Sequence, residues 1–178
     1  MGERVHHAEL EKHRDTVVAR WIESVVSKYP DRTGEFLRTQ TDPFSNPVAA
    51  GLDRGLGAIV DGLCQGTPPN ELHEALDEVI RIRAVQDFSA AEAVGFVFDL
   101  KSIVHDLVGQ DAGAGVRSDL EDSIDQLALS AFDVYMGCRE EMWAIRAREI
   151  RNQSLGIMER MQAWRERRAA ENEGESSP

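Results

Sequence analysis

Five histidines are the residues best suited to hold haem or a transition metal in this chain. His6 and His13 fall on one edge of the first predicted helix, but they lie two turns, about 10 Å, apart. Zinc ligands on one helix are normally three or four residues apart. None of the other three, His7, His73 and His105, stands clearly at the head of a predicted apolar pocket. We therefore expect no haem, no metal site and no other cofactor.

Nucleophilic or acid–base catalysis would need a recognisable pair of reacting side chains. Cys64 and Cys138 form no CxxC pair, and we interpret them as reduced thiols of a cytoplasmic protein. The sequence has no GxSxG, no phosphate-binding glycine loop and no HExxH. We predict no catalytic residue, and a protein that is not an enzyme; catalysis stays an alternative that the sequence does not support.

Arg83 is the charged residue whose position predicts burial. It shares one face of a predicted helix, 70–86, with the apolar residues Leu72, Leu76 and Val79. A buried guanidinium needs a carboxylate or several carbonyl groups as partners, because an unpaired buried charge costs several kcal/mol.

A long C-terminal helix, predicted to begin at about residue 118, carries two carboxylates on one of its apolar stripes, Asp125 and Glu140. We predict that Arg83 pairs with one of them and that Gln86 joins the same polar network. The network is either a structural bridge that fixes helix register or a polar ligand pocket, and the sequence leaves both open.

The segment 42–47 (DPFSNP) has the composition of a turn. Its two prolines fix φ, and Pro47 suits the first position of a following helix. We expect Asp42, Phe44 and Asn46 to shape a loop beside the polar network.

Apolar residues recur at helical spacing along nearly the whole chain, and no stretch alternates for long enough to predict a strand. We predict an all-α fold with one helical domain, 1–168, and a disordered acidic tail, 169–178. A loop or a short helix is expected in 31–46. The other helices are expected at about 5–29, 47–65, 70–86, 89–108, and from 118 to 150 or as far as 168.

Local signals mark where some of these helices begin and how two of them pack. Ser89–Glu92 and Ser118–Glu121 both have the capping-box pattern. Gly51 and Gly55 lie on the apolar side of the 47–65 helix, where each costs about 1 kcal/mol relative to alanine. They predict that another helix passes very close, the alternative being two tolerated glycines.

The long C-terminal helix has apolar residues around most of its circumference, which predicts burial on several sides. One stripe includes Trp143. Further along, Ile157, Met161 and Trp164 recur with Ile150 at the spacing of a short coiled-coil seam, and eight arginines lie between 139 and 168. This region is either a docking helix, for a second copy or for a partner with an acidic surface, or a solvated helix end.

The chain has 178 residues and a formal net charge of -12, which opposes nucleic acid as the main partner. No apolar run approaches the roughly 20 residues of a membrane span, so we expect no membrane insertion. The N-terminus lacks the apolar region of a signal peptide, which predicts a cytoplasmic protein.

Three segments together resemble a known family: 42–47 (DPFSNP), 81–88 (RIRAVQDF) running into 93–101 (AVGFVFDLK), and 132–140 (FDVYMGCRE). The chain is similar to the RsbRD N-terminal domain family, the sensory domains of RsbT co-antagonist proteins in bacterial stress signalling. The resemblance implies a globin-like helical fold without haem, and a homodimer built on the terminal helices.

In these stress-signalling proteins the domain leads through a helical linker into a STAS domain. The chain ends after its last predicted helix, so we expect the stand-alone form. We predict a non-catalytic, sensor-like regulatory module that acts through protein contacts as a homodimer, with an unknown protein partner. The alternatives are an accessory protein of an enzyme complex in sulfur or anaerobic energy metabolism, as gene neighbourhoods of stand-alone members suggest, and a carrier of a small apolar ligand.

Overall fold

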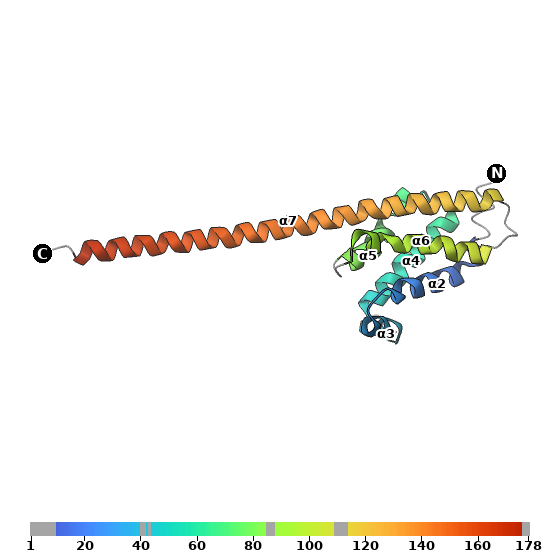
Figure 1. Ribbon diagram of the computed structural model, residues 1–178, viewed down its shortest axis with the longest axis horizontal. Coiled ribbons are helices and arrows are strands. Elements are labelled where there is room, and N and C mark those ends of the chain that lie inside the picture. The colour runs from blue at the N-terminus through green and yellow to red at the C-terminus, as the bar shows by residue number, and fades with distance from the viewer. Residues whose placement is uncertain (1–9, 40–41, 43, 85–87, 109–113, 176–178) are drawn as a thin grey trace. The chain divides into compact units, whose positions relative to one another are not determined.

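The structure is a computed structural model that describes residues 10–39, 42, 44–84, 88–108 and 114–175. Helices and short connections account for all of these residues, and none of them lies in a strand, which confirms the all-α prediction. Figure 1 shows the elements: α2 (Arg14–Ser27), α3 (Asp31–Thr39), α4 (Pro47–Gln65), the 3₁₀ turn η1 (Pro69–Glu71), α5 (His73–Ala84), α6 (Ala90–Val108) and α7 (Ala114–Glu175).

The chain divides into two units, Met1–Cys138 and Arg139–Pro178, and α7 contributes to both. The predicted domain boundary at 168 lies within α7 and stays a prediction. The helix also continues to Glu175, which covers most of the tail that we expected to be disordered. The segment 169–175 has no proline and includes alanine and glutamate, both strong helix formers, so an existing helix can propagate through it.

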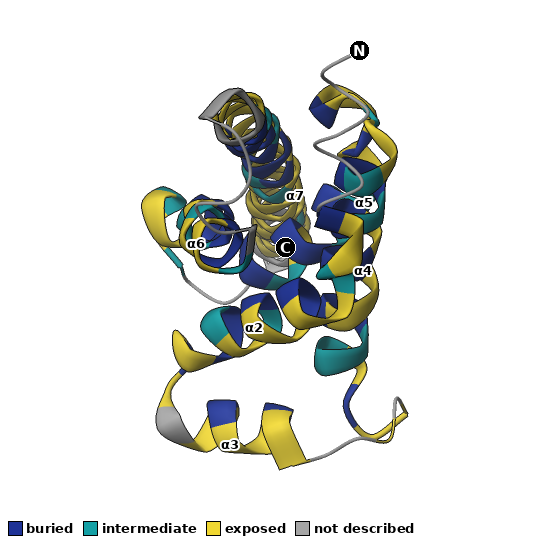
Figure 2. Cartoon of the chain, turned by 90° about the vertical axis from the view of Figure 1, so that its right-hand side faces the viewer, coloured by how far each residue is buried: buried dark blue, intermediate teal, exposed yellow. Residues whose placement is uncertain are grey.

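The core of the first unit lies between α2, α4, α5, α6 and the first half of α7, and Figure 2 shows their buried faces. Trp21 is its largest member; its indole N–H donates to the Phe96 carbonyl at 2.8 Å, and the two rings stack at 5.6 Å. The side chains with almost no exposure include Val17, Val25, Leu52, Leu56, Ile59, Leu76, Val79, Ile80, Val97, Leu100, Ile124, Leu127 and Ala131.

Two glycines let α4 and α5 approach closely, as predicted. A Cβ on Gly55 would lie 2.5 Å from Cγ2 of Val79 and 3.1 Å from the carbonyl oxygen of Ala75. A Cβ on Gly51 would lie 2.9 Å from Cδ1 of Ile82. A larger residue at position 55 would therefore press on the Val79 side chain and on the backbone of α5, whereas at position 51 a shift of the end of the Ile82 side chain could make room.

Helix ends agree with the sequence signals in some places and not in others. The capping box at Ser89 is confirmed, because the Glu92 carboxylate accepts from the Ser89 N–H and the Ser89 hydroxyl accepts from the Glu92 N–H. The predicted start at Ser118 is wrong, because α7 begins at Ala114. Once a turn has formed, each added residue contributes one hydrogen bond, and no proline stops the helix between 114 and 118.

The first predicted helix is interrupted: residues 10–12 are helical, His13 is in a turn, and α2 follows. The part of that prediction in 5–9 lies outside the described residues. The predicted 70–86 helix begins later, at His73, because η1 occupies Pro69–Glu71.

We predict that Gly55→Ala destabilises the protein by about 1–3 kcal/mol, because the added methyl group overlaps the stiff Val79 side chain and the backbone of α5. The matched control is Gly95→Ala in α6, where nothing lies within 4 Å of the added Cβ. That change should stabilise by up to about 1 kcal/mol through helix propensity. Urea denaturation followed by circular dichroism measures both; equal stabilisation by the two variants would contradict the close packing.

Candidate functional site

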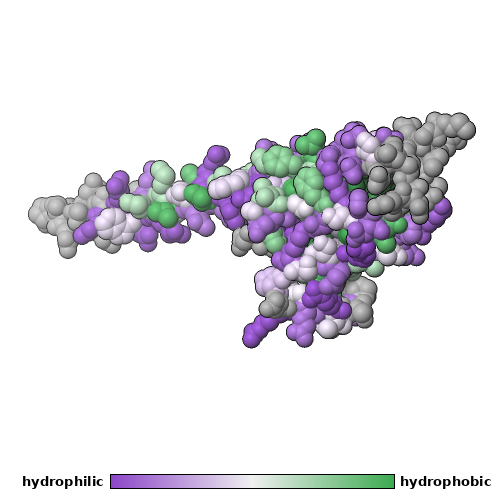
Figure 3. All heavy atoms as spheres, turned by 45° about the vertical axis from the view of Figure 1, so that its right-hand side comes forward, coloured by the Kyte–Doolittle hydropathy of each residue, from purple (hydrophilic) through white to green (hydrophobic). Residues whose placement is uncertain are grey.

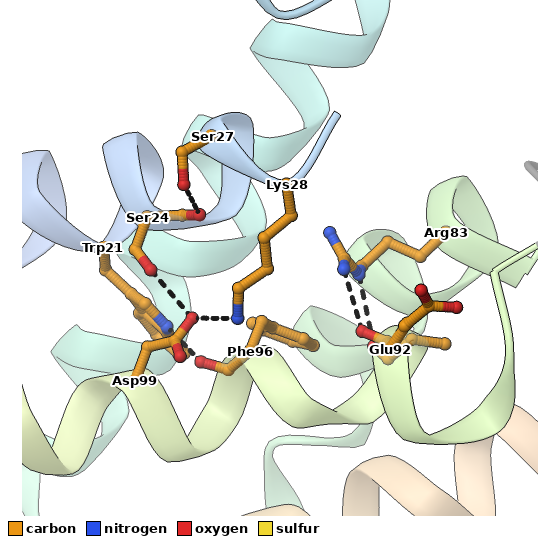
Figure 4. A network of polar contacts seen from close by, with 9 residues as sticks. Trp21, Ser24, Ser27, Lys28, Arg83, Glu92, Phe96 and Asp99 are labelled. Carbon is orange, nitrogen blue, oxygen red and sulfur yellow. Dashed lines mark hydrogen bonds and ion pairs between the residues drawn. The ribbon is translucent and has the colours of Figure 1, made fainter. Parts of the chain in front are cut away.

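Arg83 is fully buried near the end of α5 and forms hydrogen bonds with the start of α6. Its Nη2 donates to the carbonyl oxygen of Glu92 at 2.8 Å, and its Nε donates to that of Ala93 at 3.3 Å (Figure 4). Both acceptors lie in the first turns of α6. The predicted burial of Arg83 is therefore confirmed, and its described hydrogen-bond partners are main-chain oxygens.

Three aromatic rings surround the same guanidinium. Its central carbon lies 4.4 Å from the ring centroid of Phe88, 5.4 Å from that of Phe96 and 5.8 Å from that of Tyr29. Contact with the ring faces favours a buried cation. Burial lowers the pKa of Arg83, but an arginine starts so high that it stays charged near neutral pH.

Two buried polar atoms at this centre, Nη1 of Arg83 and the hydroxyl of Tyr29, make no hydrogen bond of good geometry within the described residues, but the two side chains attract each other electrostatically. Burial is the main cause of the raised pKa of Tyr29. The Arg83 centre thus connects α5 to α6 and to the end of α2, and we interpret it as a structural link within the first unit.

The carboxylate partners predicted for Arg83 need correction. Asp125 forms an ion pair with Lys101 on α6 at 2.7 Å, so its predicted pairing with Arg83 is wrong. Glu140 is exposed and belongs to the second unit, and Gln86 lies outside the described residues. Helical periodicity locates the buried face of α5, but it cannot show that the first carbonyl groups of α6 come within reach of the guanidinium.

A second polar group joins α2 to α6 nearer the surface. The carboxylate of Asp99 accepts a hydrogen bond from the Ser24 hydroxyl at 2.8 Å and pairs with Lys28 through the same oxygen (Figure 4). The Lys28 and Asp99 side chains are partly exposed, so the pair adds little to stability. No signal in the sequence singled out this group.

The predicted loop residues form a capped turn. Asn46 is buried at the N-cap of α4, where its side-chain oxygen accepts from the Ala49 N–H at 3.0 Å and its amide donates to the Leu37 carbonyl at 3.3 Å. The Asp42 carboxylate accepts from the N–H and the hydroxyl of Ser45, which lowers the pKa of Asp42. Their described contacts shape α3 and α4. The position that we predicted for this loop, beside the Arg83 network, stays a prediction.

Phe44, the third loop candidate, has 96% of its surface exposed. A single exposed phenylalanine in a turn is no site by itself, since soluble proteins commonly expose isolated apolar residues.

Large apolar side chains are exposed along α7 and part of α6 in the first unit. Leu129 is 69% exposed, Phe132 46% and Met136 41%, and Phe98 on α6 is 49% exposed. The Nζ atom of Lys101 lies 5.9 Å from the ring centroid of Phe98 and binds Asp125, one helical turn before Leu129. These four apolar residues, which we call the α7 face, therefore flank the junction of the two helices; Figure 3 shows hydrophobic side chains gathered on this unit.

The second unit also exposes large apolar residues, including all four predicted interface candidates. Trp143, Ile157, Met161 and Trp164 each have at least 50% of their surface exposed. Arginines accompany both tryptophans: the central guanidinium carbon of Arg146 lies 5.9 Å from the Trp143 centroid, and that of Arg168 lies 5.0 Å from the Trp164 centroid. The role of these residues in an interface stays a prediction at this point.

Other kinds of site find no support in the part of the chain that the structure describes. Within it, no three or more His, Cys, Asp or Glu side chains come together as metal ligands would. None of the helices among these residues is both long enough and apolar enough to cross a bilayer. Burial raises the pKa of the Cys64 thiol to about 11, which makes it a poor nucleophile near neutral pH.

Substitutions of Arg83 distinguish carbonyl partners from a buried carboxylate. We predict that Arg83→Lys destabilises by about 2–3 kcal/mol, because lysine keeps the buried charge but loses the planar contact with the rings and the two directed hydrogen bonds. Arg83→Met removes the charge and keeps much of the volume, so it should cost less.

The order of the two variants in urea denaturation is the test. With carbonyl partners the lysine variant is the less stable of the two. A methionine variant clearly less stable than the lysine variant would contradict this account, because that order indicates a buried carboxylate left without its cation.

Comparison with protein families gives a match over most of the chain. The family model described as the RsbT co-antagonist protein rsbRD N-terminal domain matches residues 15–150. No curated protein sequence and no solved structure is significantly similar to the chain. The globin-like fold that the family resemblance implies therefore stays a prediction. The family match spans α2 to the middle of α7, well over half of the chain, and the chain belongs to the RsbRD N-terminal domain family.

Proposed function

We propose that this protein is a non-catalytic, sensor-like regulatory module of the cytoplasm that acts through protein contacts and works as a homodimer. Its family consists of the N-terminal domains of RsbT co-antagonist proteins, which suggests a regulatory or sensory module in signalling. The proposal of a homodimer rests on the exposed α7 face.

The α7 face has the properties of a surface that another protein covers. Leu129, Phe132 and Met136 are spaced by three and four residues, so their side chains lie on one side of the helix. Full burial of a large apolar side chain stabilises a protein by about 1.5–3 kcal/mol. Each of these three side chains lacks part of that stabilisation while it is exposed to water. The same stretch of α7 buries Leu127, Ala131 and nearby residues in the core, so the helix has two apolar sides and fills only one of them within the unit.

A second copy is the occupant that we favour for the α7 face. Phe98 and Leu129 provide the apolar centre, and the Lys101–Asp125 ion pair provides a polar edge beside them. An apolar centre with a polar rim is the usual anatomy of a protein interface. Because both signs of charge are present at that edge, two copies related by a twofold axis can meet there without net repulsion.

The structure gives less support to a carrier of an apolar ligand. The hollow lined by Arg14, Asp61 and Cys64 contains an ion pair, with Nε of Arg14 2.7 Å from Oδ1 of Asp61. Such a lining suits water or ions better than an apolar molecule. An apolar molecule in this hollow would displace the water that solvates these charges, which costs free energy.

We predict that Phe132→Glu weakens the homodimer, because a dimer would bury the new carboxylate against apolar side chains. The dimer dissociation constant should rise at least tenfold, equivalent to about 1.4 kcal/mol. Size-exclusion chromatography with light scattering over a range of protein concentrations measures it.

Gln126→Glu is the matched control, since it adds the same charge at an exposed position of the same helix outside the α7 face. It should leave the dissociation constant unchanged. If the Phe132→Glu protein remains a dimer as tight as the unmodified protein, the α7 face does not hold the two copies together.

A further inference from the structure

A seven-residue repeat runs through the second unit. Trp143, Ile150, Ile157 and Trp164 follow one another at intervals of seven, and smaller or flexible residues lie four positions after the first three of them. We call this set the C-terminal seam; it comprises Trp143, Ala147, Ile150, Ser154, Ile157, Met161 and Trp164. Every member is exposed, and the alternating spacing of four and three is that of a helix that packs along a second helix.

Arginines line both edges of the C-terminal seam. One edge consists of the residues directly before the four-spaced seam members, and it includes Arg146 and Arg160. The other edge consists of the residues directly after the seven-spaced members, and it includes Arg151 and Arg165. All four are exposed. The remaining flanking positions hold Ala144, Gln153 and Met158, so no acidic residue lies on either edge.

The glutamates of this stretch lie away from the edges. Glu149 and Glu159 occupy the side of the helix opposite to the seam. The arrangement therefore places only positive charge beside the apolar residues of the seam, while both glutamates, together with Arg148, lie off its edges. A solvated helix end has no need for edges of a single charge sign.

The flanking arginines disfavour a second copy of this chain as the occupant. In a parallel pair of helices, a flanking residue faces the residue five positions later on the other helix. Arg146 would then face Arg151 of the second copy, and Arg160 would face Arg165. In an antiparallel pair each edge of one helix faces the same edge of the other helix, so arginine again faces arginine. Like charges at these positions oppose pairing and select other partners.

We propose that the C-terminal seam binds an amphipathic helix of a different protein, one with Asp or Glu along both sides of its own apolar stripe. Such a helix places a carboxylate opposite each of the four arginines, where bidentate hydrogen bonds form readily. Ala147 and Ser154 are small, which leaves room in the seam for leucine-sized side chains of the partner. The inference rests on the proposed function as an interaction module: the α7 face joins two copies, and the seam recognises the partner.

The test uses the full chain and two synthetic helical peptides of four heptads, both with leucine along the apolar stripe. One carries glutamate and the other lysine at every flanking position. The acidic peptide should bind at least tenfold more tightly than the basic one at low salt, by isothermal titration calorimetry. The ratio should fall as salt rises, because exposed charges are screened.

Charge reversal shows whether the seam arginines determine the preference. The variant with Arg146→Glu, Arg151→Glu, Arg160→Glu and Arg165→Glu should prefer the basic peptide instead. The matched control, Arg148→Glu, lies off both edges and should keep the preference for the acidic peptide. Circular dichroism of each variant checks that α7 remains helical.

Several outcomes would overturn the inference. Two of them are equal binding of the two peptides and binding of neither peptide. A third is that the chain binds vesicles of one part phosphatidylserine to three parts phosphatidylcholine more tightly than it binds the acidic peptide. A fourth contrary outcome is a Phe132→Glu protein that still forms dimers and loses them on Ile150→Ala and Ile157→Ala, because a second copy would then occupy the seam.

Light scattering of the same samples separates this inference from the proposed homodimer. If the protein is a dimer and does not bind the acidic peptide, only the inference about the seam is contradicted. A monomer that binds the acidic peptide contradicts only the homodimer.

Discussion

Exposed apolar surface on α7 is the physical constraint on which this account of the protein depends. Water disfavours such surface in proportion to its area, and the first unit already buries one side of α7 in its core. The opposite side keeps Leu129, Phe132 and Met136 exposed, and the second unit exposes both of its tryptophans. A helix that needed only to be soluble would carry polar residues there, so these positions are best explained by partners that cover them.

The interior of the first unit gives that surface a stable support. Close contact between α4 and α5 at Gly55 and the link from Arg83 to the first carbonyl groups of α6 hold three helices together. The aromatic rings around Arg83 allow a cation to be buried without a described carboxylate partner. These contacts give the Arg83 centre a structural role in the first unit.

Sequence periodicity predicted much of the architecture, because burial has the period of the helix. It located the buried face of α5, including Arg83, and the side of α4 on which Gly51 and Gly55 meet another helix. It could not choose among the polar partners that a folded chain brings together, so the pairing with Asp125 was wrong. The start of α7 was also misjudged, because a capping pattern at Ser118 has no effect when the preceding residues are already helical. The exposed seam was visible in the sequence, but which side of α7 the core covers required the fold.

Sedimentation equilibrium of the full chain, at protein concentrations from about one to a hundred micromolar, measures directly whether the α7 face joins two copies. We expect a mass of two copies over the upper part of that range, with dissociation to one copy on dilution. A mass of one copy at every concentration would contradict this expectation, because the apolar α7 face would then stay in contact with water in the absence of other proteins.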